Sequence, residues 1–390
     1  MRRALHLFAM SGLTFLSLGL LTWVALQIDT LGASTASAAP ANQARNLTVL
    51  VGGGQDTLQA LNFFPMSVRV RQGNTVTWRI EGDELHTASF VKGVTEWGPG
   101  AAQIPLGAPG EMNPGFAAPI PGGPPEALQL NPQLAFPTRA PGASVETYSG
   151  PGRFVSSGAF EKEATFPGAP PNNTFSVMFD TPGTYMYVCL VHNDRMYGWV
   201  EVAPANATDV PNQAAIDAQA SAELAQMMAL IQTARAQGDA TVRSEPGPNG
   251  TSIWFARAGN QELHSGDSRA QVIDFLPKNL TVTAGDTVVW GTNYFHTVSF
   301  VPAPPNPEFI EVVPQPAGPP LLPLNPTVIF PAKPSATYDP TQYFSSGIIG
   351  PFLPPGNSWA LAFDRPGTYE YVCLVHELLG MKGTITVLPR

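Results

Sequence analysis

One stretch of the chain occurs twice with the same order of turn-forming, aromatic and β-branched residues. It reads FDTPGTYMYVCLVH from Phe179 to His192 and FDRPGTYEYVCLVH from Phe363 to His376. The Pro-Gly pair is typical of a turn, and the Tyr-x-Tyr-Val run that follows is rich in residues that favour strands. Each copy therefore predicts a strand that leads into a loop carrying one cysteine and one histidine.

The repetition extends upstream of this stretch. FPMSVRVRQGNTVTW, from Phe64 to Trp78, aligns with LPKNLTVTAGDTVVW, from Leu276 to Trp290. Val68 and Val70 alternate with arginines, which is the period-two pattern of a half-buried strand, and the glycine in each copy marks a hairpin turn. Antiparallel strands at this spacing, separated by turns, predict a β-sandwich in each half.

Each half also carries the residues of a metal site. The candidate ligands are His86, Cys189, His192 and Met196 in the first half, and His296, Cys373, His376 and Met381 in the second. Two imidazoles, one thiolate and a weak thioether form the ligand set of a blue copper site, which exchanges one electron. Sulfur ligands favour Cu(I) and imidazoles suit both oxidation states. We therefore predict two type 1 copper ions per chain as cofactors.

Other interpretations of the same residues remain open at this point. The chain has only 2 cysteines, and in an exported protein two cysteines can form a disulfide. A buried cysteine is more often an inert small hydrophobe, and a lone methionine is more often a core residue than a ligand. Equivalent cysteines in two repeats rarely meet, because each lies in the core of its own domain, so we favour copper. His6 and His264 match no ligand position.

The spacing of these residues resembles that of the cupredoxin family, in particular its plastocyanin/azurin-like members. The loops Cys189-x-x-His192-x3-Met196 and Cys373-x-x-His376-x4-Met381 follow the family pattern, and each has an upstream His-Thr-x-Ser-Phe. The resemblance covers most of both halves. It implies an all-β protein with two tandem cupredoxin-like Greek-key β-sandwiches joined by a helical linker. It also implies that His376 lies at the surface end of its loop, with Leu378 and Leu379 exposed beside it.

Length and composition agree with two exported domains. At 390 residues, with 13% charged residues and a net charge of −9, the chain is long enough for two domains and poorly suited to non-specific nucleic-acid binding. Residues 1–38 predict a signal peptide or an N-terminal membrane anchor, because Arg2 and Arg3 precede a long apolar stretch and Ala36-Ser37-Ala38 resembles a cleavage site. We expect the folded part at the periplasmic or extracellular face of the cytoplasmic membrane.

The repeats place the domain boundaries. We expect domain 1 over residues 44–203, with a Pro/Gly-rich insertion at about 91–170, and domain 2 over 251–390, with a Pro-rich insertion at about 302–356. Residues 204–250 form a linker with a helix at about 211–237. The expected packing stripe of that helix is Ile216, Ala220, Leu224, Met227 and Ile231. Gly238 suits the position past its end, and residues 239–250 suit a flexible joint.

The two insertions are related to each other, since each contains Leu-x-Leu-Asn-Pro followed by Phe-Pro and later by Ser-Ser-Gly. They are too apolar for a plain disordered linker. We expect ordered loops that pack on the sandwich near the copper end, and solvated Pro-rich loops are the alternative.

These features predict an electron-transfer protein without catalytic residues. The expected partner is a redox protein, either a cytochrome or a membrane respiratory or photosynthetic complex, and nucleic acid is not expected. Copper sequestration or delivery is the first alternative. A copper oxidase or nitrite-reductase-like enzyme is the second. Such enzymes place a histidine next to the ligand cysteine, whereas valine and leucine flank both cysteines here.

Overall fold

The structure is a computed structural model, and it describes residues 45–93, 116–124, 126–140, 142–162, 171–192, 195–240, 242–260, 267–350 and 356–390. Within these ranges, no helix has both the length and the apolar character that a membrane span requires. The predicted signal peptide or anchor lies outside the described residues, as do His6 and His264.

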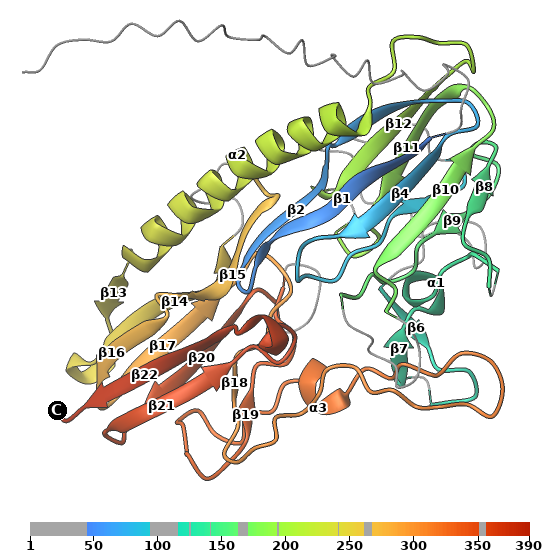
Figure 1. Cartoon of the computed structure of the whole chain (residues 1–390). Coiled ribbons are helices and arrows are strands. Elements are labelled where there is room, and N and C mark those ends of the chain that lie inside the picture. Colours follow the sequence, from blue (N-terminus) through green and yellow to red (C-terminus); the bar gives the residue numbers. More distant parts are fainter. Residues whose placement is uncertain are drawn as a thin grey trace, which may run out of the picture. The chain divides into compact units, whose positions relative to one another are not determined.

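The first half is a β-sandwich of two sheets (Figure 1). One sheet contains β1 (Asn46–Gln55), β2 (Leu58–Phe64), β4 (Thr75–Ile80), β10 (Thr174–Phe179) and β8 (Glu146–Tyr148). The other contains β3 (Ser67–Arg71), β12 (Tyr197–Ala203), β11 (Gly183–Val188), β5 (Ser89–Phe90) and β9 (Val155–Ser156). Alternate residues of β4, Val76 and Trp78, are fully buried between the sheets with Phe90 and Tyr187. The period-two pattern therefore builds the core between the two sheets.

The second half repeats this arrangement around its own core. Its first sheet contains β14 (Ser252–Asn260), β15 (Ala270–Leu276), β17 (Asp286–Gly291) and β20 (Ser358–Phe363). Its second contains β16 (Asn279–Thr283), β22 (Lys382–Leu388), β21 (Gly367–Val372), β18 (Ser299–Phe300) and β19 (Phe344–Ser345). Trp290 and Tyr371 take the places of Trp78 and Tyr187 in the core. The predicted all-β class with two sheet-rich halves is confirmed.

The two halves share one sheet. β2 and β15 pair antiparallel, with Leu58 opposite Val272, Gln59 opposite Gln271 and Ala60 opposite Ala270. Gln59 and Gln271 are equivalent positions in the repeat, so this pairing is centred on one residue and its own counterpart. Such self-complementary contact is the pattern of a twofold-symmetric interface. The halves therefore meet locally as two copies of one unit would meet in a dimer.

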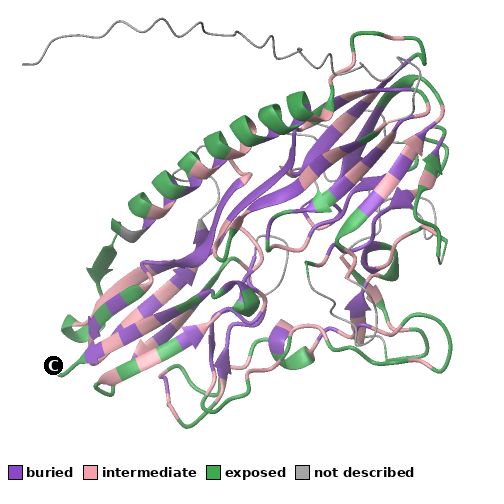
Figure 2. Ribbon diagram, viewed as in Figure 1, coloured by how far each residue is buried: buried purple, intermediate pink, exposed green. Residues whose placement is uncertain are grey.

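A long helix, α2 (Gln213–Ala240), lies along β1, β2 and β15 (Figure 1). Its inward residues at the expected spacing are Ile216, Ala220, Leu224, Met227 and Ile231, of which all but the half-buried Leu224 are buried. The outer side of the helix is exposed (Figure 2). Because strands of both halves lie under one helix, α2 adds a second connection between them.

The helix does not end before Gly238, as the sequence suggested, but continues to Ala240. A β-carbon at Gly238 would lie 2.6 Å from Leu276 Cδ1. Glycine at this position therefore permits close approach to β15 rather than marking a helix end. The expected flexible joint is also wrong in part, because β13 (Arg243–Pro246) pairs antiparallel with β14 and η2 (Pro248–Gly250) follows it.

The insertions contain matching local structure. β6 (Ala117–Pro119) and β7 (Leu128–Leu130) precede the short helix α1 (Pro132–Ala135), and α3 (Pro326–Ile329) is its counterpart in the second half. The Asn131 side chain accepts a hydrogen bond from Gln133 N at 3.0 Å, and Asn325 does the same for Thr327 N at 2.9 Å. The repeated Asn-Pro pair is thus an N-cap followed by the first helical residue.

The insertions also connect the two halves and support the sites. Leu130 N donates to Leu322 O at 2.8 Å, and Leu324 N donates to Leu128 O at 2.9 Å. Further along each insertion, Phe160 N donates a hydrogen bond to the His86 carbonyl oxygen at 2.8 Å. In the second half, Ile349 N donates to the His296 carbonyl oxygen, also at 2.8 Å. The backbone of each upstream histidine is therefore fixed by the insertion of its own half.

Candidate metal centres

The first centre is assembled from two separate segments. Cys189, His192 and Met196 lie between β11 and β12, and His86 lies between β4 and β5. Cys189 N donates to Met196 O at 2.8 Å, which closes the loop between those two residues. The Thr87 hydroxyl accepts a hydrogen bond from Leu190 N at 2.8 Å, so the histidine segment is attached directly to the cysteine loop.

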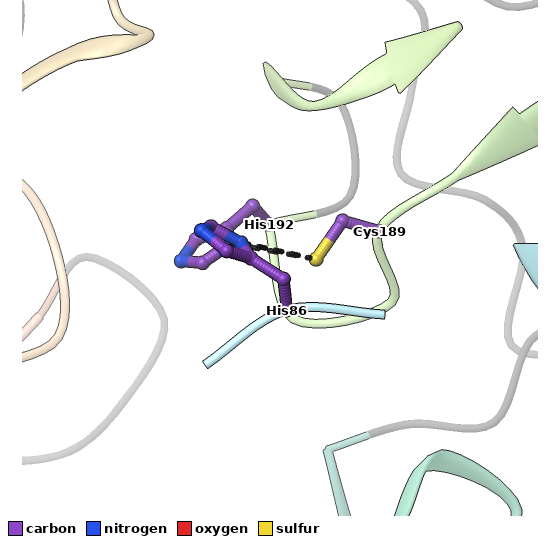
Figure 3. A group of neighbouring side chains, drawn as sticks. All are labelled: His86, Cys189 and His192. Carbon is purple, nitrogen blue, oxygen red and sulfur yellow. Dashed lines mark hydrogen bonds between the residues drawn. The ribbon is translucent and has the colours of Figure 1, made fainter. Parts of the chain in front are cut away.

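The donor atoms of the first centre converge on one point (Figure 3). His86 Nδ1 and His192 Nδ1 lie 3.2 Å apart, and the Cys189 sulfur lies 3.4 Å from His192 Nδ1 and 3.8 Å from His86 Nδ1. All three side chains are buried. Thr87 N also points at the sulfur, at 3.3 Å. A buried cluster of two nitrogens and one sulfur has the donor chemistry of a copper or zinc site.

The second centre repeats this geometry closely. His296 Nδ1 and His376 Nδ1 lie 3.1 Å apart, and the Cys373 sulfur lies 3.5 Å and 3.9 Å from His376 and His296. Thr297 N lies 3.3 Å from the sulfur. The repetition seen in the sequence is therefore a repetition of the site itself.

Both methionines lie in the same cores as their cysteines. Met196 and Met381 are fully buried, and Cys373 N donates to Met381 O at 3.0 Å, as Cys189 N does to Met196. This backbone pairing, within one core, places each methionine opposite its cysteine across the loop, which suits a weak fourth ligand. The two cysteines are free and occupy separate cores, so the disulfide alternative is wrong.

A pair of glycines makes room for the upstream histidines. Gly52 and Gly259 lie at bulges in β1 and β14, with φ of +66° and +76°. A β-carbon would lie 2.4 Å from His86 Nε2 at the first position and 2.3 Å from His296 Nε2 at the second. Sequence reasoning missed both residues. They are equivalent in the structure, each lying at the bulge of the strand that pairs in parallel with β4 or β17, but their different distances from the repeated Phe64–Trp78 and Leu276–Trp290 segments hid this in the sequence.

Sequence reasoning also missed Glu84, which lies between the two centres. Its side chain is 9% exposed, and its Oε1 atom lies 3.6 Å from His376 Nε2 and 4.0 Å from His192 Nε2. Burial opposes ionisation of this carboxyl, but the positive charge and hydrogen bond of His376, with help from His192, lower the pKa of Glu84 to about 2. The first half thus supplies a buried carboxylate to a ligand histidine of the second half.

The two loop histidines respond differently to this carboxylate. Burial lowers the pKa of His192 well below its ordinary range. Burial also opposes protonation of His376, but the nearby Glu84 carboxylate and Cys373 thiolate raise the pKa of His376 to about 10. Glu84 lies nearer to His376, and the Cys373 thiolate adds to its effect, whereas the charges of His86 and Arg195 add to the effect of burial at His192. Because metal ligands must be deprotonated, copper would displace a proton from this second centre.

The cysteines and upstream histidines titrate according to their surroundings. Burial raises the pKa of Cys189 to about 11, whereas the imidazoles of His376 and His296 overcome burial and hold the pKa of Cys373 well below its ordinary value. Burial lowers the pKa of His86 to about 4 and lowers that of His296. Both upstream imidazoles are therefore neutral near pH 7, the form that binds a metal.

The structure corrects the expected exposure around the second loop. His376 is only 7% exposed and His192 only 3%. Leu378 is fully exposed on η3 (Glu377–Leu379), but Leu379 is buried in the core of its half. The loop histidines are covered because the two halves face each other at this edge. Asn193 and Asp194 of the first loop lie outside the described residues.

Comparison with known proteins gives matches to copper proteins. Residues 262–388 match the family described as copper binding proteins of the plastocyanin/azurin family. A plastocyanin of Scenedesmus fuscus is 31% identical over 127 residues, which cover 31% of this chain and 91% of that protein.

Among solved structures, the chain is similar to a mutant plastocyanin of fern. The two are 22% identical, the match covers 34% of this chain and 99% of that chain, and the TM-score is 0.20. It is also similar to a purple cupredoxin from Nitrosopumilus maritimus. These two are 17% identical, the match covers 34% of this chain and 98% of that chain, and the TM-score is 0.19. Because the Scenedesmus fuscus plastocyanin is 31% identical and is matched over 91% of its length, the chain belongs to the plastocyanin/azurin family of copper-binding proteins, and its two ligand sets fit two type 1 copper ions.

Proposed function

We propose that this protein is an exported carrier of single electrons with two type 1 coppers, which exchanges electrons with redox partners outside the cytoplasmic membrane. The observation that supports this function best is the pair of buried triads with matching distances. The copper would be held by His86, Cys189, His192 and Met196 in one half, and by His296, Cys373, His376 and Met381 in the other. When bound, copper supplies a one-electron couple between Cu(I) and Cu(II).

The protein residues keep the site nearly unchanged in both oxidation states. Thr87 and Thr297 each direct a backbone N–H at the sulfur and use their hydroxyl to fix the loop that carries it. Such contacts around the ligands hold their orientation and tune the reduction potential. A rigid, buried donor set with little to rearrange suits fast exchange of one electron.

A catalytic copper site would need further histidines. The four histidines among the described residues are all used in the two triads. Val188 and Leu190 flank Cys189, where the enzymes named above have a histidine. These observations favour a carrier over an oxidase or a nitrite reductase.

Copper sequestration or delivery is the second candidate, and burial of both loop histidines favours it. A partner cannot touch an imidazole that is 3% or 7% exposed. The two functions differ in rate, because a carrier must be reduced and reoxidised by a partner protein rapidly, whereas a store need not be.

We also propose that the partner docks near the second loop. Leu378 is fully exposed one residue after Glu377, close to the ligand His376, so a partner that covers this side chain would approach the second centre. The net charge of −9 favours a partner with a basic surface. A cytochrome or a membrane respiratory or photosynthetic complex fits this description, and residues 1–38 could keep the protein at the membrane. Leu378→Asp should slow reaction with such a partner, whereas Leu388→Asp, at the end of β22, should not.

The function is tested by loading the purified protein with Cu(II). We expect two coppers per chain, an intense thiolate-to-copper band in the visible spectrum, and repeated reduction and reoxidation in stopped-flow experiments with a c-type cytochrome. A protein that binds two coppers but exchanges electrons only over minutes would be a store, and a protein without the visible band would not be a type 1 copper protein.

A further inference from the structure

A single carboxylate contacts the outer nitrogens of the loop histidines of both centres. Glu84 Oε1 lies within 4.0 Å of His192 Nε2 and within 3.6 Å of His376 Nε2. The other carboxylate oxygen, Oε2, is buried without a hydrogen-bond partner among the described residues. Among the described residues, the groups whose charge acts on this carboxylate are the ligand imidazoles His376, His192 and His86. A buried carboxylate in such surroundings needs a reason for its position.

The chemistry of the imidazoles provides this reason. His192 and His376 turn Nδ1 toward their cysteine sulfurs, at 3.4 Å and 3.5 Å. When Nδ1 of a neutral imidazole binds a metal, the proton of the ring is on Nε2, which becomes a hydrogen-bond donor. Metal-binding histidines usually donate this proton to a carboxylate or a carbonyl oxygen. Here two such donors, one from each half, face one carboxylate.

The repeat explains why the carboxylate serves both centres. Glu84 lies two residues before His86, and Tyr294 lies two residues before His296. Each residue reaches across to the loop histidine of the other half, since Tyr294 stacks on His192 with ring centroids 6.4 Å apart. A symmetric arrangement would have two carboxylates or two aromatic rings. The chain has one of each, so only the first half supplies a carboxylate from this position of the repeat.

We propose that Glu84 is a positioning residue that bridges the two copper centres: it accepts a hydrogen bond from His376 Nε2, faces His192 Nε2 at 4.0 Å, and provides the route for an electron between the two halves. This inference rests on the proposed function. In the transfer, one centre changes from Cu(I) to Cu(II) while the other changes from Cu(II) to Cu(I). Both Nε2 protons stay in place, so one electron moves and no bond is formed or broken.

The bridge has two measurable consequences. The buried negative charge stabilises the more positive oxidation state of both centres, and burial keeps solvent from screening it. The carboxylate beside each Nε2 also alters the electronic environment of the remote ring nitrogens, which pulsed electron paramagnetic resonance detects in the Cu(II) state. Loss of the carboxylate should therefore raise both reduction potentials and change the remote-nitrogen signal at both centres.

The test compares Glu84→Gln with Glu81→Gln in the copper-loaded full-length protein. Glu81 belongs to the same segment, but its side chain is 46% exposed and its ion pair with Arg79 is at the surface. We expect Glu84→Gln to raise both reduction potentials and to shift both remote-nitrogen signals. Each signal is assigned by repeating the measurement in a Cys189→Ala background, which leaves only the second copper, and in a Cys373→Ala background, which leaves only the first. Glu81→Gln should leave both measurements at their native values. A change at only one centre, or equal effects of the two variants, would overturn the bridge.

Electron transfer between the centres is measured directly after flash reduction by a flavin radical. The native protein should show a kinetic phase whose rate does not depend on protein concentration. Rapid-freeze electron paramagnetic resonance monitors this phase through the separate signals of the two Cu(II) centres. Glu84→Gln should slow this phase roughly tenfold, equal to about 1.4 kcal/mol in activation free energy. Glu84→Asp keeps the charge but shortens the side chain, so it should slow the phase while leaving the potentials close to native.

The outcomes separate this inference from the proposed function. A native protein that binds no copper, or shows no thiolate-to-copper band, would overturn the proposed function. A native protein with two type 1 coppers but no concentration-independent phase would overturn the bridge alone. So would equal rates in the native protein and in whichever Glu84 variant folds and binds copper.

Discussion

The ring of Tyr294, in the second half, stacks on the imidazole of His192, in the first half, with planes inclined by 24° and centroids 6.4 Å apart. The Tyr294 hydroxyl donates to the Val191 carbonyl oxygen at 3.4 Å, and the Arg195 guanidinium lies 4.4 Å from the ring centroid. The second half therefore shields the metal-binding edge of the first, and this accounts in part for the 3% exposure of His192.

Replacing this tyrosine should open the first centre to small reagents. We expect Tyr294→Ala to speed reduction of the first copper by a small external reductant several-fold, because water and reagent gain access to the His192 edge. The second copper should react at its native rate, which can be measured alone in a Cys189→Ala background because that variant lacks the first copper. Stopped-flow absorbance measures both rates. Equal acceleration of the two coppers would mean that the whole contact between the halves had loosened, against this prediction.

Each cysteine should control one copper. Cys189→Ala and Cys373→Ala remove the strong thiolate ligand of one centre and leave the other triad, in a separate core, intact. We expect each variant to retain one copper and about half of the visible band, measured by metal analysis and absorbance. A folded single variant that lost both coppers would show that the centres depend on each other for binding.

The two coppers should differ in reduction potential. Leu379 is buried in the core of the second centre, whereas the first loop is one residue shorter and polar in sequence, with Asn193-Asp194-Arg195 where the second has Glu377-Leu378-Leu379-Gly380. Polarity around the thiolate and the axial ligand distance both tune the potential of such sites. A redox titration should resolve two one-electron steps, assigned with the cysteine variants. Identical midpoints in those two variants would contradict this expectation.

The glycines behind the upstream histidines should be needed for copper binding. Gly52→Ala or Gly259→Ala would force an imidazole out of place, lowering copper affinity at that centre by about 10- to 100-fold. Gly73→Ala is the matched control, because Gly73 has φ of +83° but nothing within 4 Å of an added β-carbon. Competition with a copper chelator measures the affinities. If Gly73→Ala weakened copper binding as much, backbone strain alone would explain the effect.

The stability of the second half should depend on pH through Asp286, whose equivalent in the first half, Asn74, does not ionise. Burial opposes ionisation of Asp286, but hydrogen bonds from Thr283 N, Trp254 Nε1 and Ser252 N, with the charge of Arg390, lower its pKa below the ordinary value of 3.8. A depressed pKa in the folded state gives stability that is present above about pH 4 and is lost as the pH falls through the folded pKa.

Asp286→Asn should therefore destabilise the metal-free protein by about 1–3 kcal/mol at pH 7 and by progressively less as the pH falls below about 4 toward the folded-state pKa. The first half already has Asn74 at the equivalent position, where the side chain accepts a hydrogen bond from Arg71 N at 3.1 Å, so the substitution suits the turn. Urea unfolding at pH values across this range provides the measurement. The same loss of stability at every value would show that the charge of Asp286 does not matter.

The ligand sets and the sandwich fold could be predicted because their signals are local. Cys189, His192 and Met196 lie on one loop, and the period-two strands that support it are readable over a few residues. Because each motif occurs in both halves, each copy supported the interpretation of the other. The packing stripe of α2 was predictable for the same reason, but its end was not, because Gly238 reads as a helix terminator until Leu276 is seen against it.

By itself, the sequence determined which side chains can bind copper and that there are two such sets, since donor chemistry and loop spacing are properties of short segments. Only the tertiary structure decided that the two centres face each other. Glu84 contacts His376 because β2 pairs with β15 and the insertions join the two halves. Those contacts connect residues far apart in the chain, and no local pattern around Glu84 records where its side chain will be buried.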